Sequence, residues 1–176
     1  MSAEQQRFLD LFDALVEANN AWMTGTPKEK WNWVPFDNPN MKFGDRISTI
    51  TIKSVFIHTI VGETQWATML PTVGEGAEMA MDPAKIKALT RELDEAEDLI
   101  GASMRLHAGN LKAYGSIGPE QLTRRFRWSK RDWSVMGFLW GIYSHRSYHL
   151  GNIDIFMREA DEPAPDFFSN FRQEMA

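Results

Sequence analysis

The chain has 176 residues, of which 43% are hydrophobic and 24% are charged, the composition of one globular domain with a sizeable core. Nineteen Lys and Arg residues against 24 Asp and Glu residues give a formal net charge of -5, which argues against nucleic acid as a partner. The sequence contains no cysteine, which excludes disulfides, Fe–S clusters and cysteine nucleophiles, so any metal must be bound by His, Asp or Glu.

The first twenty-odd residues have the spacing of an amphipathic helix that ends near Gly25 and Pro27. Its apolar stripe consists of Phe8, Leu11, Phe12, Leu15 and Trp22. Acidic and basic residues in the same segment leave no room for a secretory signal, so we expect a cytoplasmic protein. The longest stretch without a charged or strongly polar residue runs from Val135 to Tyr143, far short of the roughly 18 to 20 residues of a membrane span.

A long crossing loop rich in Pro, Asn, Gly and Trp is expected from Pro27 to Asp45, followed by a helix from about Asp45 to Leu70. A third helix is predicted from about Pro83 to Ala108, with Asp82 as its cap. The side chains expected to point inward from it are Ile86, Leu89, Leu93, Ala96, Ile100 and Met104. We expect the acidic residues of this segment to form a solvated face.

The alternation from Gln121 to Trp128 indicates a short strand or hairpin arm that packs on the helices. The last long helix is predicted to begin at Asp132 as its cap and to reach about Ala160. A final short helix capped by Asp166 and carrying Phe167, Phe168 and Phe171 would close the core or offer an apolar patch to a second subunit. No domain boundary is evident, so we expect one all-α domain over residues 1–176, a four-helix bundle with long crossover connections.

Histidines dominate the candidate chemistry. His145 and His149 lie one turn apart on one helix face, about 40° and about 6 Å from each other. His58 lies midway along the second predicted long helix and supplies a third imidazole. Three neutral imidazoles leave coordination positions open for water or substrate, as in a catalytic metal site.

Spacing alone favours the simpler interpretation of a hydrogen-bonded histidine pair in the core. The balance shifts because three of the four histidines lie on two helices that a bundle would bring face to face. Gly141 lies one turn before His145, and a glycine inside a helix costs roughly 1 kcal/mol relative to alanine. Close packing or space above a metal would explain it.

Two neighbours of these histidines are candidates for orienting a ligand or lining the site. Asn152 lies within about 60° of both His145 and His149 around the helix, and Tyr148 flanks the same face. Ordinary hydrogen-bonded core residues are the commoner alternative for each. Glu63 and Asp154 lie five positions from the nearest candidate ligand, about 140° around the helix, and are not expected to bind metal.

The remaining polar features have simpler explanations. His107, near the end of the third predicted helix, is expected to have a capping or surface role. A basic cluster near the predicted hairpin comprises Arg124, Arg125, Arg127, Lys130 and Arg131. It is expected to be the solvated face of the hairpin. If it is functional, its partner would be an anionic cosubstrate or an acidic helix of a neighbouring subunit. Neither a P-loop nor a Gly-x-Ser-x-Gly elbow is present.

The segment from Ser144 to Asn152 resembles the His-x-x-His-His-Arg-Gly-Gln signature of the DinB-like (DinB/YfiT-type) metalloenzymes. Tyr148 replaces the first of the paired histidines, Leu150 replaces Arg and Asn152 replaces Gln, so the ligand positions are retained. His58, followed by Glu63 and Trp66, is similar to the histidine on the second helix of that family.

The resemblance implies a four-helix bundle, often a homodimer, in which His58, His145 and His149 bind one divalent metal such as nickel, zinc, manganese or iron. Asn152, Tyr148, Gly141 and Trp66 would line the site or support its ligands. Characterised members include transferases and isomerases that use a low-molecular-weight thiol.

Our leading hypothesis is a metalloenzyme that transfers or adds a thiol to a small electrophilic molecule, or hydrolyses such a molecule. Two alternatives remain open at this point. One is a non-catalytic small-molecule-binding or stress-response protein that uses the same aromatic cavity. The other is a dimerising scaffold with core histidines.

Overall fold

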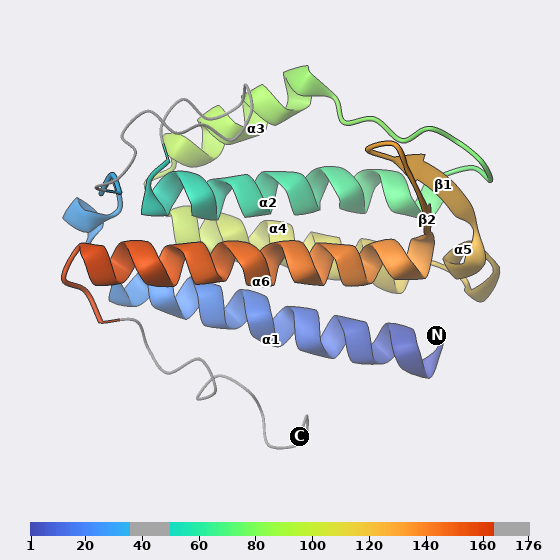
Figure 1. The fold of residues 1–176 in the computed structure, drawn as a ribbon, viewed down its shortest axis with the longest axis horizontal. Helices are drawn as coiled ribbons and strands as arrows, with labels where there is room; N and C mark the ends of the chain where they lie inside the picture. The colour runs from blue at the N-terminus through green and yellow to red at the C-terminus, as the bar shows by residue number, and fades with distance from the viewer. Residues whose placement is uncertain (36–49, 164–176) are drawn as a thin grey trace.

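The computed structural model describes residues 1–35 and 50–163 and is dominated by four long helices. These are α1 (Ala3–Gly25), α2 (Ile52–Met69), α4 (Leu99–Gly115) and α6 (Val135–Glu159). Contacts join α1 to α4, α4 to α2, α2 to α6 and α6 to α1, so the four helices close a ring around the core. In Figure 1, α1 and α6 run in one direction and α2 runs in the other. The predicted all-α bundle with long crossover connections is confirmed.

The first helix forms as expected. The Ser2 side chain caps it by accepting a hydrogen bond from the backbone N–H of Gln5 at 3.1 Å, and the helix ends at Gly25, before Pro27. Four of the five apolar residues predicted for its stripe are buried, namely Phe8, Phe12, Leu15 and Trp22. The three aromatic side chains among them, Phe8, Phe12 and Trp22, therefore belong to the core.

Thr51 defines the start of α2. Its side chain accepts from the N–H of Ser54 while the Ser54 hydroxyl accepts from the N–H of Thr51, a reciprocal capping box. The predicted start at Asp45 is therefore wrong. The short 3-10 helix η1 (Lys28–Lys30) begins the preceding connection, and η2 (Leu70–Thr72), which contains Pro71, follows α2.

The predicted third helix is two helices. The helix α3 (Pro83–Asp94) is capped by Asp82 as expected, but the chain leaves the helix after Asp94 and starts α4 with Asp98 as a new cap. The Asp98 carboxylate accepts from the N–H of Gly101 at 2.8 Å. Because this corner changes the rotational phase of the helix, Met104 points outward and is 58% exposed, contrary to prediction. Figure 1 shows α3 above α2, outside the ring of four helices.

In chain order, the hairpin arm follows α4 and precedes α6. A short helix, α5 (Pro119–Thr123), occupies the start of the predicted strand, and β1 (Arg125–Trp128) then pairs with β2 (Arg131–Ser134) in antiparallel register. Ser129 and Lys130 form the two-residue turn with φ angles of 51° and 63°, the left-handed values that tight hairpins require. Because β2 extends to Ser134, Ser134 rather than Asp132 caps α6.

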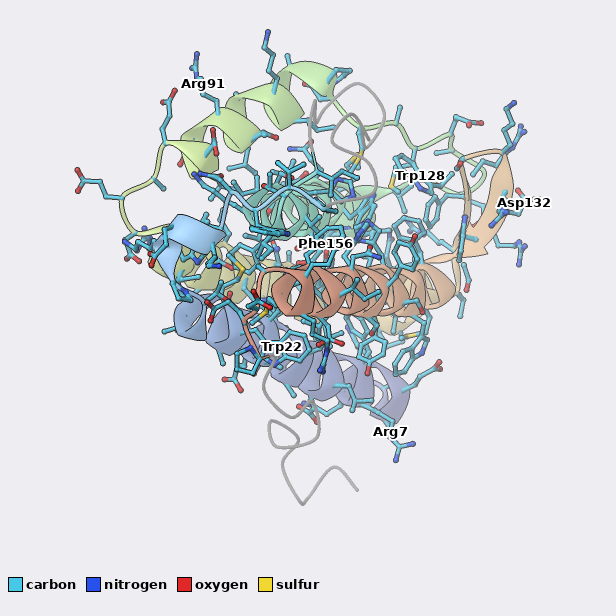
Figure 2. All side chains as sticks on the ribbon, turned by 60° about the vertical axis from the view of Figure 1, so that its left-hand side comes forward. Arg7, Trp22, Arg91, Trp128, Asp132 and Phe156 are labelled. Carbon is cyan, nitrogen blue, oxygen red and sulfur yellow. The ribbon has the colours of Figure 1, made fainter. Side chains whose placement is uncertain are left out.

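The hairpin is fixed to the bundle on its inner side. Phe126 is 1% exposed and packs against Phe138 of α6. The backbone of Arg127 also exchanges hydrogen bonds of 2.8 Å with Ala77 and Met79 in the preceding connection. Figure 2 shows Asp132 at the outer edge of the arm, while Arg7 and Arg91 point away from the bundle.

Within residues 1–35 and 50–163, none of the helices has the length and apolar character to cross a membrane. The predicted final helix at Asp166, with Phe167, Phe168 and Phe171, lies outside the described residues. The same holds for residues 36–49 of the predicted crossing loop.

Candidate metal centre

The structure brings His58, His145 and His149 together between α2 and α6. One nitrogen from each imidazole lies within 4.8 Å of the other two. The Nε2 atoms of His58 and His145 are 3.3 Å apart. A tetrahedral site with metal–nitrogen bonds of about 2.0 to 2.1 Å separates its nitrogen ligands by roughly 3.3 to 3.4 Å. The His58–His145 pair already has this spacing, so the three imidazoles could hold one ion once side-chain adjustment brings the His149 nitrogen to the same separation.

His149 is held by its neighbour one turn further along α6. Its Nδ1 lies 3.2 Å from Asn152 Oδ1, so Nδ1–H donates to the amide oxygen and Nε2 carries the lone pair that a metal requires. Burial lowers the pKa of His149 to about 4, with the charge of Arg146 adding to the effect and the hydrogen bond to Asn152 opposing it. His149 is therefore neutral at pH 7, the form that binds metal.

The other two histidines are half-buried, which leaves the cluster in contact with solvent. The Trp66 ring meets His145 edge to face, with ring centroids 5.1 Å apart. Gly62 lies beside this contact, and a Cβ atom there would be 3.4 Å from the Trp66 ring and 3.9 Å from His145 Cε1, which are ordinary van der Waals distances. Trp66 thus forms one wall beside the candidate ligands.

Two further residues named from the sequence are placed differently. Tyr148 flanks His149 with ring centroids 5.0 Å apart, but its side chain is 67% exposed. Gly141 faces the hairpin, since a Cβ atom there would lie 3.4 Å from Trp133 Cζ3. A Cβ atom at this distance makes an ordinary van der Waals contact, and its neighbours within 4 Å belong to Trp133 rather than to the histidines.

The acidic residues excluded as ligands are engaged elsewhere. Glu63 forms a buried ion pair with Arg146, and both side chains are 1% exposed. Asp154 accepts from Arg158 at 2.9 Å, one turn along α6. The Glu63–Arg146 pair was not expected from the sequence, although an arginine between two histidines on an inward helix face was a signal for it.

The fourth histidine is separate from the cluster. His107 is 8% exposed, and its Nε2 lies 3.0 Å from Asp13 Oδ1 on α1. The predicted capping or surface role is therefore wrong. The corner before α4 changed the phase of that helix, which turned His107 toward α1.

The basic cluster of the hairpin region is exposed, as expected for a solvated face. All five cationic residues are exposed, and Arg127 lies 3.7 Å from the Glu78 carboxylate. Glu78, which is itself exposed, thus accompanies Arg127 on the surface.

No protein-family profile matches the chain, and no curated protein matches it in sequence. A solved structure is similar, that of a DinB-like protein, YjoA, from Bacillus subtilis. The superposition has a TM-score of 0.61 at 14% sequence identity and covers 94% of this chain and 97% of that chain. The chain therefore has the DinB-like fold.

Proposed function

We propose that this protein is a divalent-metal-dependent enzyme whose ligands are His58, His145 and His149. The convergence of three imidazole nitrogens within 4.8 Å of one another is the observation that carries the proposal. Three neutral nitrogen ligands suit nickel, zinc, manganese or iron, and they leave coordination positions open. When bound, the ion would act as a Lewis acid that lowers the pKa of a thiol or water, or polarises an electrophile.

Transfer of a low-molecular-weight thiol to a small electrophile is the reaction that we favour. The thiol sulfur would form a bond to the electrophilic carbon, the leaving group would depart with its bonding electrons, and the thiol proton would pass to solvent. Hydrolysis would instead use a water molecule activated by the same ion as the nucleophile. Glu63, the buried carboxylate on α2, is paired with Arg146, so our preference for the thiol rests on the resemblance of residues 144–152 to the thiol-dependent members of the DinB-like family.

The residues around the candidate ligands have defined tasks in this proposal. Asn152 holds the His149 ring through Nδ1, which would leave Nε2 to bind the ion. Trp66 shields one side of His145 from water. The half-buried His58 and His145 leave a route by which a small thiol and its partner reach the site.

A turnover assay tests this proposal. The protein is loaded in turn with each of the four metals and mixed with chlorodinitrobenzene and cysteine as probe electrophile and probe thiol. We expect metal-dependent thioether formation that is lost in His58→Ala. His107→Gln is the matched control, since it removes a buried histidine outside the cluster. Metal binding without any turnover would favour the small-molecule-binding alternative.

A homodimer is a further part of the proposal. Tyr148 and Ile155 are 67% and 57% exposed and lie seven residues apart on α6, which places them on one face. Exposed large apolar side chains on one helix face are typical of subunit contacts. Light scattering at several concentrations would give a dimer mass if the proposal holds and a monomer mass if it does not.

A further inference from the structure

A buried arginine links the two helices that carry the candidate ligands. Arg146 directly follows His145 and is 1% exposed. Its Nε donates to Glu63 Oε1 at 2.7 Å and its Nη2 donates to Glu63 Oε2 at 2.5 Å. A third donor, Nη1, reaches Asn19 Oδ1 on α1 at 2.7 Å. We call Arg146, Glu63 and Asn19 the clamp.

We propose that the clamp is a positioning device for the three histidines, which holds α6 at the rotation that aims His145 and His149 at His58. The inference rests on the proposed metal site. The clamp is suited to this task because it joins the same two helices as the ligands do. Arg146 lies between the two α6 histidines, and Glu63 lies five residues after His58.

The paired hydrogen bonds from the Arg146 guanidinium fork to Glu63 make this contact directional. A guanidinium that donates two parallel hydrogen bonds to one carboxylate fixes the plane and the direction of both groups. The bond to Asn19 adds a third helix, so α6 is held from two sides. A lysine at this position would supply the charge without the fixed direction.

Metal coordination is sensitive to helix rotation of this kind. An imidazole nitrogen on an extended side chain lies on the order of 7 Å from the helix axis, so turning α6 by about 10° moves it by roughly 1 Å. Metal–ligand distances tolerate deviations of only about 0.2 Å. If the rotation of α6 about its axis were fixed less tightly, the metal affinity of the site would therefore fall while the bundle stays folded.

Stability alone does not account for the clamp. The desolvation of two buried charges offsets most of their attraction, and well-packed apolar residues of similar volume serve a core equally well. The best-attested use of such pairs is to specify one arrangement among several. Here the arrangement specified is the rotation at which three imidazoles meet.

The test compares metal binding in two clamp variants with a matched control. Glu63→Leu/Arg146→Met replaces the pair with apolar side chains, and Arg146→Lys keeps the charge but removes the fork. Ser103→Ala is the control, because Ser103 is 1% exposed and donates to Asn20, a buried hydrogen bond that joins α4 to α1 rather than α2 to α6. Each protein is titrated with Co²⁺, whose visible spectrum reports ligand geometry, and with Zn²⁺ in competition with a chelator.

We expect both clamp variants to bind metal about 10- to 100-fold more weakly than the wild type, with an altered cobalt spectrum, while the control binds normally. A folded clamp variant with wild-type affinity and spectrum would overturn the inference. If the apolar pair prevents folding, Arg146→Lys carries the test alone. Failure of the wild type itself to bind either metal would overturn the proposed metal site and the clamp together.

Discussion

The loss of Arg146 alone has a large effect that the structure allows us to estimate. Both members of the ion pair are 1% exposed, so Arg146→Met leaves the Glu63 carboxylate buried without a counter-charge. Removing one partner of a buried pair costs about 3 to 5 kcal/mol. In a protein of this size, each kcal/mol lowers the Tm by roughly 2 to 4 °C, so we predict a decrease of roughly 6 to 20 °C.

The double variant Glu63→Leu/Arg146→Met separates this penalty from the loss of side-chain volume. Replacing a whole buried pair with apolar residues is neutral or stabilises by about 1 to 4 kcal/mol. Against this, Asn19 loses the donor to its Oδ1, which costs about 1 to 3 kcal/mol. We therefore expect the double variant to lie within about 3 kcal/mol of the wild type.

Urea unfolding followed by tryptophan fluorescence measures both variants, since the chain contains seven tryptophans. The midpoints and slopes give the free energies of unfolding by linear extrapolation. The reasoning fails if Arg146→Met costs less than about 1 kcal/mol at pH 7. It also fails if the double variant loses as much stability as the single variant.

Three further substitutions follow from local geometry. Asn152→Ala removes the acceptor for His149 Nδ1–H, so metal affinity measured by chelator competition is expected to fall about 10- to 100-fold; an unchanged affinity would show that Asn152 does not orient the ring. Gly109→Ala adds a Cβ that meets no atom within 4 Å on α4, so urea unfolding is expected to show a gain of about 0.5 to 1 kcal/mol; a loss would mean that the added methyl group meets something. Lys130→Gly relieves a backbone φ of 63° in the hairpin turn and is expected to raise the free energy of unfolding by about 1 kcal/mol; a lower value would contradict the left-handed turn.

The sequence contained the information for most of the fold at the level of helices and caps. Apolar spacing predicted α1, and Asp82 followed by Pro83 marked the start of α3. The corner before α4 was missed because Asp98 lies in an acidic run, and such a run is also typical of a solvated helix face. Only the backbone shows that its side chain caps a new helix.

The candidate site was predictable in part. The spacing of His145 and His149 placed them on one face, and the bundle architecture brought His58 opposite them. The clamp could not be predicted in the same way, because its hydrogen bonds join residues 83 and 127 positions apart in the sequence. Arginine is also rarely fully buried, so the residue type of Arg146 suggested a position on the surface.

The most direct test of the three-histidine centre is the metal content of the untagged protein, measured by plasma mass spectrometry beside His58→Ala and His107→Gln. We predict about one divalent transition metal per chain in the wild type and in His107→Gln, and none in His58→Ala. No metal in the wild type, even after reconstitution with nickel, zinc, manganese and iron, would contradict the account and leave the histidines as core residues.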